Sequence, residues 1–388
     1  MSGRDLFCEP RRIRRGAALT LVFASVLVAG AATGSFDGPG RKSVFPSASS
    51  DRSDHEEDIA DAAAEAMADG KSPVEAAERA VSRSGDRWGA VYSRGDYEEF
   101  EEALDGRYTG VGLWARRERG GRIEVTRVRS GSPAAAAGIR KGDRLRTVDN
   151  HRVDGRPVTE VVSLLRGDAT DADAGTTVAL GLQRGTRAWT ETLRRARLST
   201  DSVSVRELPR GVTVIEVAAF TKGSGDLVRS AVAGVPADGG IVLDLRGNAG
   251  GLVTEAVTAA SAFLDGGLVA TYDVNGDQQA LHADPGGDTA RPLVALVDGG
   301  TMSAAELLTG GLQDRGRAVV VGSRTFGKGS VQMPSRLPDG SVAELTVGHY
   351  RTPSGHTVDA RGITPDLEVE EGALERAATV LSGLGNPS

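Results

Sequence analysis

Length, composition and charge exclude several classes of protein. The chain has 388 residues, 39% of them hydrophobic and 26% charged, which is enough for two or three globular domains with a sizeable core. A formal net charge of −7 at pH 7, without a basic face interleaved with aromatic residues, argues against a general nucleic-acid binder. The single cysteine, Cys8, excludes a disulfide within the chain and removes cysteine nucleophiles and cysteine metal ligands from all that follows.

Residues 1–34 have the pattern of an export signal. Four arginines within residues 11–15 precede an apolar run over about 17–32 that ends in small residues. The run is short for a membrane-spanning helix of about 20 residues, and residues 29–31 offer a cleavage site. A signal peptide and an N-terminal membrane anchor both remain open. We expect an exported, extracytoplasmic protein, membrane-anchored or secreted, with a Gly-, Pro- and Ser-rich linker over 35–53.

Four further stretches follow. Residues 54–105 are rich in Ala and Glu at helical spacing, which predicts an N-terminal helical region of two or three small helices. Residues 106–198 consist of short β-type runs between Gly and Asp turns, with two short helical stretches, and this pattern predicts a small β-rich module. Residues 199–375 alternate strands with helices, which predicts right-handed crossovers and a largely parallel sheet. Residues 376–388 are expected to be a C-terminal tail.

Three Gly-rich turns follow predicted strands of the alternating region. They are "RGNAGG" at 246–251, "DGGTMS" at 298–303 and "SRTFGKGS" at 323–330. All carboxyl ends of a parallel sheet lie on one edge, where ligands bind. We therefore expect the three turns to converge at one site.

Ser303 opens the predicted helix after the second turn and has two possible roles. With Glu306 it has the spacing of a capping box, and helix capping is the commoner role of such a serine. A serine nucleophile would need a base. His349 and His356 are possible bases, but no acidic residue stands out to orient either one. Lys328, in the third turn, is the better candidate, because only five of the 46 basic residues are lysines and one helix plus one strand would return the chain beside Ser303.

Lys328 would act as a base only when neutral, and burial lowers the pKa of a lysine. A nearby helix N-terminus also disfavours an ammonium, and Gln332 is available to orient the amine. Gly247 and Ala304 could donate backbone N–H groups to an oxyanion. By position alone, however, a lysine in such a turn is more often exposed to solvent. A lone Gly-rich turn is weak evidence for an oxyanion or phosphate site.

Taken together, several stretches resemble one family. They are "YTGVGL", "GSPAAAAGIRKGDRL", "VIEVAAF", "IVLDLRGNAGGL", "TMSAAELLTGGLQD", "TFGKGSVQ" and "YRTPSGHTVDARGITPD", which run in order from about residue 85 to 370. This chain is similar to the C-terminal processing peptidases, or tail-specific proteases, which are serine/lysine enzymes with a PDZ domain. The resemblance implies an α/β, crotonase-like peptidase core with a largely parallel sheet, an inserted small β-rich PDZ domain at 106–198 and N-terminal helices.

The resemblance also assigns roles to residues. It implies Ser303 as nucleophile, Lys328 as general base, Gln332 as the support of the lysine, and Gly247 and Ala304 as oxyanion donors. In the PDZ domain it implies that Gly110, Val111, Gly112 and Leu113 receive a peptide C-terminus, which adds as a β-strand. Many members have Ser and Ala before the catalytic serine where this chain has Thr301 and Met302, and this difference bears on substrate preference more than on activity.

We expect an exported serine endopeptidase that binds exposed, mostly apolar protein C-termini and cleaves through an acyl-enzyme. It would need no metal and no organic cofactor, and it would meet the membrane only through a possible N-terminal anchor. A non-catalytic PDZ scaffold that holds tails would bind peptides without depending on Ser303. A crotonase-like acyl-thioester enzyme would bind acyl-CoA, but the export signal, the PDZ-like module and Lys328 weigh against it.

Overall fold

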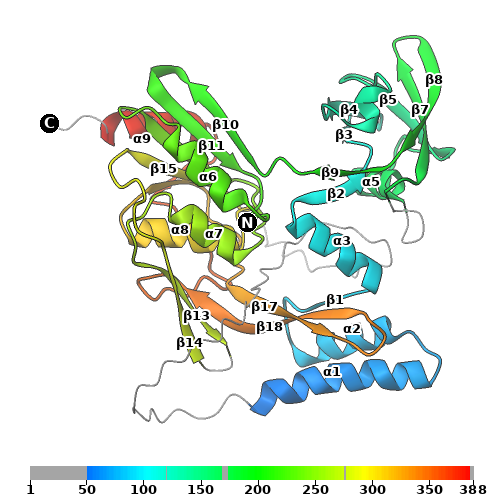
Figure 1. The fold of residues 1–388 in the computed structure, drawn as a ribbon, viewed down its shortest axis with the longest axis horizontal. Coiled ribbons are helices and arrows are strands. Elements are labelled where there is room, and N and C mark those ends of the chain that lie inside the picture. The colour runs from blue at the N-terminus through cyan, green and yellow to red at the C-terminus, as the bar shows by residue number, and fades with distance from the viewer. Residues whose placement is uncertain (1–49, 119, 168–173, 275–276, 385–388) are drawn as a thin grey trace, which may run out of the picture. The chain divides into compact units, whose positions relative to one another are not determined.

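The computed structural model describes residues 50–118, 120–167, 174–274 and 277–384 (Figure 1). The described chain forms two compact units, one of residues 109–198 and the other of residues 50–108 and 199–384. The expected signal segment, residues 1–34, lies outside the described residues. No helix within the described part is both long and apolar enough to cross a membrane.

The N-terminal part of the larger unit is helical. It contains α1 (Ser50–Ala68), α2 (Pro73–Ser84) and α3 (Arg94–Leu104), with the short strand β1 (Ala90–Tyr92) between the last two. Ser72 begins α2 by accepting a hydrogen bond from the Glu75 N–H at 3.3 Å, and a proline follows it at the first helical position. Apolar residues of α1 and α2 pack on Leu337 and Ala343, so the helices belong to the larger unit.

A six-stranded sheet forms the centre of the larger unit. In spatial order its strands are β10 (Val203–Leu208), β11 (Val212–Val217), β12 (Gly240–Asp244), β15 (Leu293–Val297), β16 (Val319–Gly322) and β19 (Leu367–Glu368). All neighbours from β11 to β19 pair in parallel. Strand β10 runs antiparallel to β11, and the short 3-10 turn η1 (Pro209–Gly211) connects the two. The predicted α/β fold with a largely parallel sheet is confirmed.

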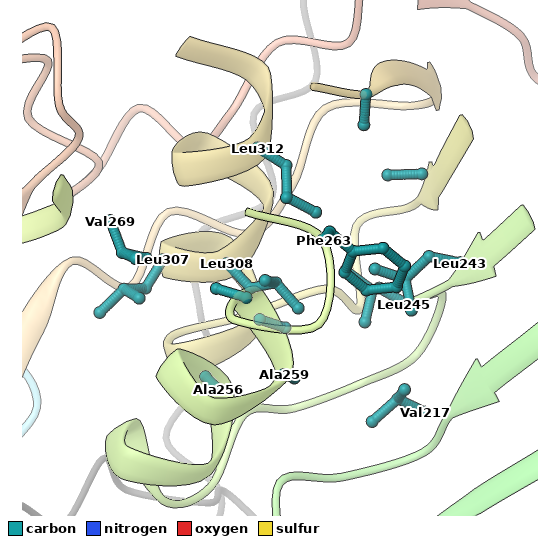
Figure 2. Close-up of a cluster of buried hydrophobic side chains, with 14 of the residues drawn as sticks. Val217, Leu243, Leu245, Ala256, Ala259, Phe263, Val269, Leu307, Leu308 and Leu312 are labelled. Carbon is teal, nitrogen blue, oxygen red and sulfur yellow. The ribbon is translucent and has the colours of Figure 1, made fainter. Parts of the chain in front are cut away.

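Helices cover both faces of this sheet. One face packs against α6 (Ser224–Ala233), α7 (Val253–Ala260) and α8 (Ala304–Asp314). Figure 2 shows this core, in which Phe263 lies near Leu243 of β12 and Leu245 just after that strand, while Leu308 and Leu312 reach in from α8. Alternate residues along each strand point to opposite faces, so the other face needs its own cover.

The second face is covered by the C-terminal helix α9 (Ala373–Leu384), which is red in Figure 1. Ala377 and Leu381 are buried against strand residues of that face, including Val242 and Val294. The expectation of a C-terminal tail from residue 376 is therefore wrong for residues 376–384. Apolar residues at helical spacing in this stretch bury a sheet face that would otherwise be exposed to water.

A second sheet carries the end of the third Gly-rich turn. Its strands follow the order β1, β18 (Val342–Arg351), β13 (Leu268–Val274) and β14 (Asp277–His282), and β17 (Ser330–Arg336) pairs with β18. Strand β17 begins two residues after Lys328. Lys328 therefore lies where the chain passes from the first sheet to the second.

The smaller unit is a β-rich module. Its main sheet has the order β3 (Leu113–Arg117), β4 (Ile123–Val128), β5 (Arg144–Val148), β7 (Thr177–Arg184) and β8 (Arg187–Arg194), with β6 (His151–Arg152) paired to β5. Helices α4 (Pro133–Ala136) and α5 (Val158–Arg166) complete its core, and β2 (Arg107–Gly110) pairs with β9 (Ala196–Ser199).

Leu308→Ala should destabilise the fold strongly, because the Leu308 side chain is fully buried in the core beneath α8. A loss of about 2–5 kcal/mol is expected from the lost burial and the cavity. Chemical denaturation followed by circular dichroism measures it. The matched control is Leu227→Ala on α6, where the leucine is 53% exposed and the loss should stay within about 0.5 kcal/mol. Equal losses in the two variants would contradict the assignment of the core.

Candidate active site

The structure brings the three Gly-rich turns together at one edge of the parallel sheet. The Met302 N–H donates to the Asn248 carbonyl at 2.9 Å, which joins the first turn to the second. The Phe326 N–H donates to the Thr301 carbonyl at 3.0 Å, which joins the third turn to the second. Asn248 is itself buried and bonds to the Val217 carbonyl at 2.8 Å. The predicted convergence therefore results from direct hydrogen bonds between the turns.

Ser303 lies directly before α8 in an unusual backbone conformation. Its φ is 59° and its ψ is −120°, which is a strained combination for a residue with a Cβ. Gly250 packs against it, and a Cβ at position 250 would lie 2.9 Å from the Ser303 Cβ. A glycine is therefore required at 250 for the first turn to approach the serine. Such strain is typical of functional positions that the surrounding structure holds in place.

The Glu306 carboxylate ties the second turn to the third. It accepts hydrogen bonds from the backbone N–H groups of Ser303 at 2.9 Å, Gly327 at 2.7 Å and Lys328 at 2.9 Å, and from the Thr325 hydroxyl. Burial raises the pKa of Glu306, and these four hydrogen bonds oppose that shift. One buried side chain thus holds the backbones of both Ser303 and Lys328.

Sequence reasoning treated Glu306 only as half of a capping box and missed this role. The Ser303 N–H does donate to Glu306, so the capping interaction exists. The available signal was the charge itself, because Glu306 is the one charged residue of the otherwise uncharged stretch "AAELLTGGL", which the structure buries from residue 304 to 312. A buried carboxylate needs several donors, and beside the Ser303 N–H three of them come from the third turn.

Tyr350 provides a second link between the same two backbones. Its hydroxyl lies 2.7 Å from the carbonyl oxygens of both Ser303 and Lys328. The side chain is 1% exposed, and burial raises the pKa of its hydroxyl well above the ordinary value, so it remains a proton donor. Tyr350 lies on β18, so the second sheet helps to position both residues.

Lys328 is not the exposed turn lysine that its position alone suggests. It is 1% exposed, and its ammonium lies 5.6 Å from the centre of the Trp88 ring. Burial lowers the pKa of Lys328 to about 8, against the opposing effects of the Glu344 and Asp86 carboxylates. A substantial fraction of the lysine is therefore neutral at mildly alkaline pH, as a general base must be.

Gln332 is buried on β17, and its side-chain amide donates to the Trp88 carbonyl. Its Oε1 atom is also buried and has no hydrogen-bond partner within the described part of the chain. The structure therefore places Gln332 and the amine of Lys328 against the same residue, Trp88.

Gly247 and Ala304 both lie at this edge, and of their two backbone N–H groups only that of Gly247 donates to a partner among the described residues. Gly247 has a φ of 69°, and its N–H donates to the Asp298 carboxylate at 2.8 Å. Ala304 is the first residue of α8, where backbone N–H groups have no partner within the helix. In this conformation the Gly247 donor is therefore engaged by a carboxylate.

The two histidines considered as bases have other surroundings. The His349 ring is 42% exposed and lies 3.9 Å from Asp359, whereas Ser303 is fully buried. The His356 ring contacts the Ser354 hydroxyl at 2.8 Å. These contacts favour Lys328 as the base.

The loop from Gly110 to Leu113 in the smaller unit is held through its carbonyls. The Val111 carbonyl accepts from the Ala134 N–H at 3.0 Å, and the Gly112 carbonyl accepts from the Arg129 N–H at 2.9 Å. The N–H groups of Val111 and Gly112 donate to no acceptor among the residues that the structure describes. Gly112 has a φ of 76°, and a Cβ there would lie 2.3 Å from the Ser132 Cβ. Such paired free donors suit a carboxylate.

Family models match both units: the model for peptidase family S41 over residues 211–369 and the PDZ domain model over 124–172. The chain belongs to peptidase family S41. The S41 match includes all three Gly-rich turns, with Ser303, Glu306 and Lys328, and the PDZ match lies within the smaller unit. The predicted family and the PDZ domain are thus confirmed.

Individual relatives agree with this assignment. The chloroplastic carboxyl-terminal-processing peptidase 3 of Arabidopsis thaliana is 32% identical over 76% of this chain and 60% of its own length. The carboxy-terminal processing protease CtpA of Bacillus subtilis strain 168 is 31% identical over 70% of this chain and 58% of its own. The chain thus spans about 60% of the length of these relatives.

A solved structure supports the fold. A protein of Bacteroides fragilis NCTC 9343 that is assigned to the S41 proteases matches 81% of this chain and 91% of its own. The TM-score is 0.53 and the sequence identity is 17%, so this likeness concerns the fold alone.

Glu306→Gln should loosen both turns of the S41 site, because the amide replaces one accepting oxygen by a donor that faces backbone N–H groups. We expect a loss of about 2–4 kcal/mol in the free energy of unfolding. Faster hydrogen exchange is expected at Gly327 and Lys328. The exposed Glu370→Gln serves as control and should change neither quantity. Unchanged exchange at both amides in Glu306→Gln would contradict the bridging role.

Proposed function

We propose that this chain is an exported serine endopeptidase that binds protein C-terminal tails through its PDZ domain and cleaves them with Ser303 as nucleophile and Lys328 as general base. The observation that carries the proposal is the joint fixation of these two residues. Glu306 and Tyr350 each bond to the backbones of both. Burial of Lys328 adds the chemical requirement, since it lowers the pKa of the amine to about 8.

The reaction would begin with a neutral Lys328. Its amine accepts the proton of the Ser303 hydroxyl while the serine oxygen attacks the peptide carbonyl carbon. The tetrahedral intermediate collapses when the C–N bond breaks and the leaving amine takes the proton from Lys328. Water, activated by the same lysine, then hydrolyses the acyl-enzyme. Gln332 would support the lysine through the Trp88 contact that they share.

The oxyanion of the tetrahedral intermediate needs donors in a fixed place. The Ala304 N–H follows the nucleophile at the start of α8, where the helix dipole also favours a negative charge. We assign the second donor to the Gly247 N–H. Because that N–H now donates to Asp298, the productive state requires the carboxylate to release it.

The PDZ domain would take the substrate tail. The free N–H groups of Val111 and Gly112 would bind the terminal carboxylate, with Gly110 and Leu113 at the two ends of the loop. The peptide would then extend along strand β3, which begins at Leu113. We propose protein or peptide substrates with apolar C-termini, together with export directed by residues 1–34, as a cleaved signal peptide or a membrane anchor.

Ser303→Ala and Lys328→Ala should each strongly reduce cleavage of an unstructured reporter protein that ends in an apolar tail. Loss of the base alone should slow the reaction by roughly 10²–10⁴-fold, and loss of the nucleophile by at least as much. Mass spectrometry of the products measures both effects. The control is Lys222→Ala, whose lysine side chain is 71% exposed and should be dispensable. Equal cleavage by the parent and Lys328→Ala would overturn the assignment, and tail binding without Ser303-dependent cleavage would favour the scaffold.

A reporter peptide with a C-terminal amide should bind the PDZ domain much more weakly than the free acid. The amide removes the negative charge that the Val111 and Gly112 N–H groups are proposed to accept, and a loss of about 10-fold or more is expected for charge-assisted hydrogen bonds. Fluorescence anisotropy with the Ser303→Ala variant measures binding without cleavage. Equal affinities for acid and amide would exclude these residues as the carboxylate site.

A further inference from the structure

Glu344 is a fully buried carboxyl group that the proposed mechanism does not use. It lies on β18, between Ala90 of β1 and Pro334 of β17 in the sheet register. Strand alternation places its side chain on the same face as those of Val342 and Thr346. That face packs against Tyr92, Tyr97 and Phe100 near Val342, and it bonds to Asp86 at Thr346.

Neither carboxyl oxygen of Glu344 has a hydrogen-bond partner in the described part of the chain. A buried carboxyl without donors is costly unless an opposite charge lies near or the group is protonated. Burial raises the pKa of Glu344 to about 7, and the Lys328 ammonium is the charge that opposes this shift. Gln332 and Pro334 of β17 pair with Thr346 and Glu344 of β18, so the side chains of Gln332 and Glu344 lie on the same face of the sheet. Gln332 bonds to Trp88, and the Lys328 amine lies 5.6 Å from the centre of the Trp88 ring, so this face carries Glu344 toward the surroundings of the lysine.

Among the described residues, Lys328 is the cation that lowers the pKa of Glu344, and the Arg87 guanidinium lies over the Trp88 ring, 4.6 Å from its centre. Burial, and then the charge of Glu344, raises the pKa of Tyr92 and that of Tyr97, the latter to about 12, so both hydroxyls are neutral near pH 7. Asp86 acts on Lys328 but accepts hydrogen bonds from Trp88, Gly89 and Thr346.

Two further charges act on Tyr97, and one of them, Arg336, pairs with Val342 in the register of β17 and β18. Arg336 on β17 lowers the pKa of Tyr97, and Glu101 on α3 raises it.

We infer that Glu344 is a positioning residue that acts through Lys328 and sets the pH range in which the lysine serves as general base. The inference rests on the proposed function of Lys328. An ionised Glu344 stabilises the ammonium, so it delays formation of the neutral lysine until a higher pH. The same charge stabilises the ammonium that forms when Ser303 transfers its proton.

Glu344 makes and breaks no bond in this scheme. The O–H bond of Ser303 breaks, an N–H bond forms on Lys328, and the proton later passes to the leaving amine. The carboxylate contributes only its field, which in the interior acts over several ångströms with little screening. Removing it should therefore make Lys328 easier to deprotonate and also make it a weaker base.

Titration of Lys328 tests this without requiring cleavage. The chain has five lysines, so ¹³Cε-labelled lysine gives few NMR signals, and Lys328→Arg identifies the one of interest. Glu344→Gln should move the Lys328 midpoint to lower pH by about one unit or more. Glu344→Asp should stay closer to the parent, and the exposed Glu370→Gln should leave the midpoint unchanged. An unchanged midpoint in Glu344→Gln would overturn the inference.

The pH profile of cleavage provides the second readout. If Lys328 is the base, kcat/KM in Glu344→Gln should rise at lower pH than in the parent, while kcat on the alkaline plateau falls several-fold. A merely structural role would lower activity at all pH values without moving the midpoint, and that result would overturn the inference. Circular dichroism checks the fold, and Glu344→Leu, with the same expected shift, replaces the glutamine variant if the latter does not fold. Absent cleavage with a shifted NMR midpoint would reject the proposed peptidase while leaving the Glu344–Lys328 coupling established.

Discussion

The site depends on one buried carboxylate that joins two turns of separate strands. Ser303 follows β15, and Lys328 follows β16, so nothing in the covalent chain fixes their relative position. Glu306 accepts from the N–H groups of both residues, and the single hydroxyl proton of Tyr350, on the second sheet, is shared between the two carbonyl oxygens, each 2.7 Å away. Glu306 therefore fixes the N–H groups of the two residues, and Tyr350 fixes their carbonyl groups. The strained φ of Ser303 can persist because its N–H and its C=O are each tied to a buried group.

Burial decides the charge state of Lys328. Two carboxylates, Glu344 and Asp86, favour the ammonium, yet the pKa still falls to about 8. Desolvation therefore outweighs both anions, as expected for a lysine that is 1% exposed and whose amine lies over an aromatic ring. Glu344 and Asp86 limit this decrease in the pKa, because an equally buried lysine without nearby anions would lose its proton at lower pH. Burial keeps part of the Lys328 population neutral, so the amine can accept a proton. The two carboxylates keep the pKa high enough for the amine to retain that proton.

Local sequence predicted the parts of this site that depend on local geometry. Gly-rich turns after strands, the helix beginning at Ser303 and the isolated Lys328 are readable because glycine conformation, capping and strand alternation act within a few residues. The contacts that assemble them are not local: Glu306 reaches residues about twenty positions away, and Gln332 bonds to Trp88 in the N-terminal helical region. The helix of residues 373–384 was missed for a related reason, since only the sheet face that it covers shows that its apolar residues are buried.

The two halves of the proposed machinery are in different states. The base is in place, because Lys328 is buried and its backbone is fixed. The oxyanion site is not, because the Gly247 N–H already donates to an anion, Asp298, which also accepts from the Gly300 N–H at 2.9 Å. A carboxylate beside that donor would repel a developing oxyanion as well as occupy the hydrogen bond. Asp298 lies in the same turn as Ser303, so the carboxylate that occupies the donor and the proposed nucleophile belong to one segment of the chain.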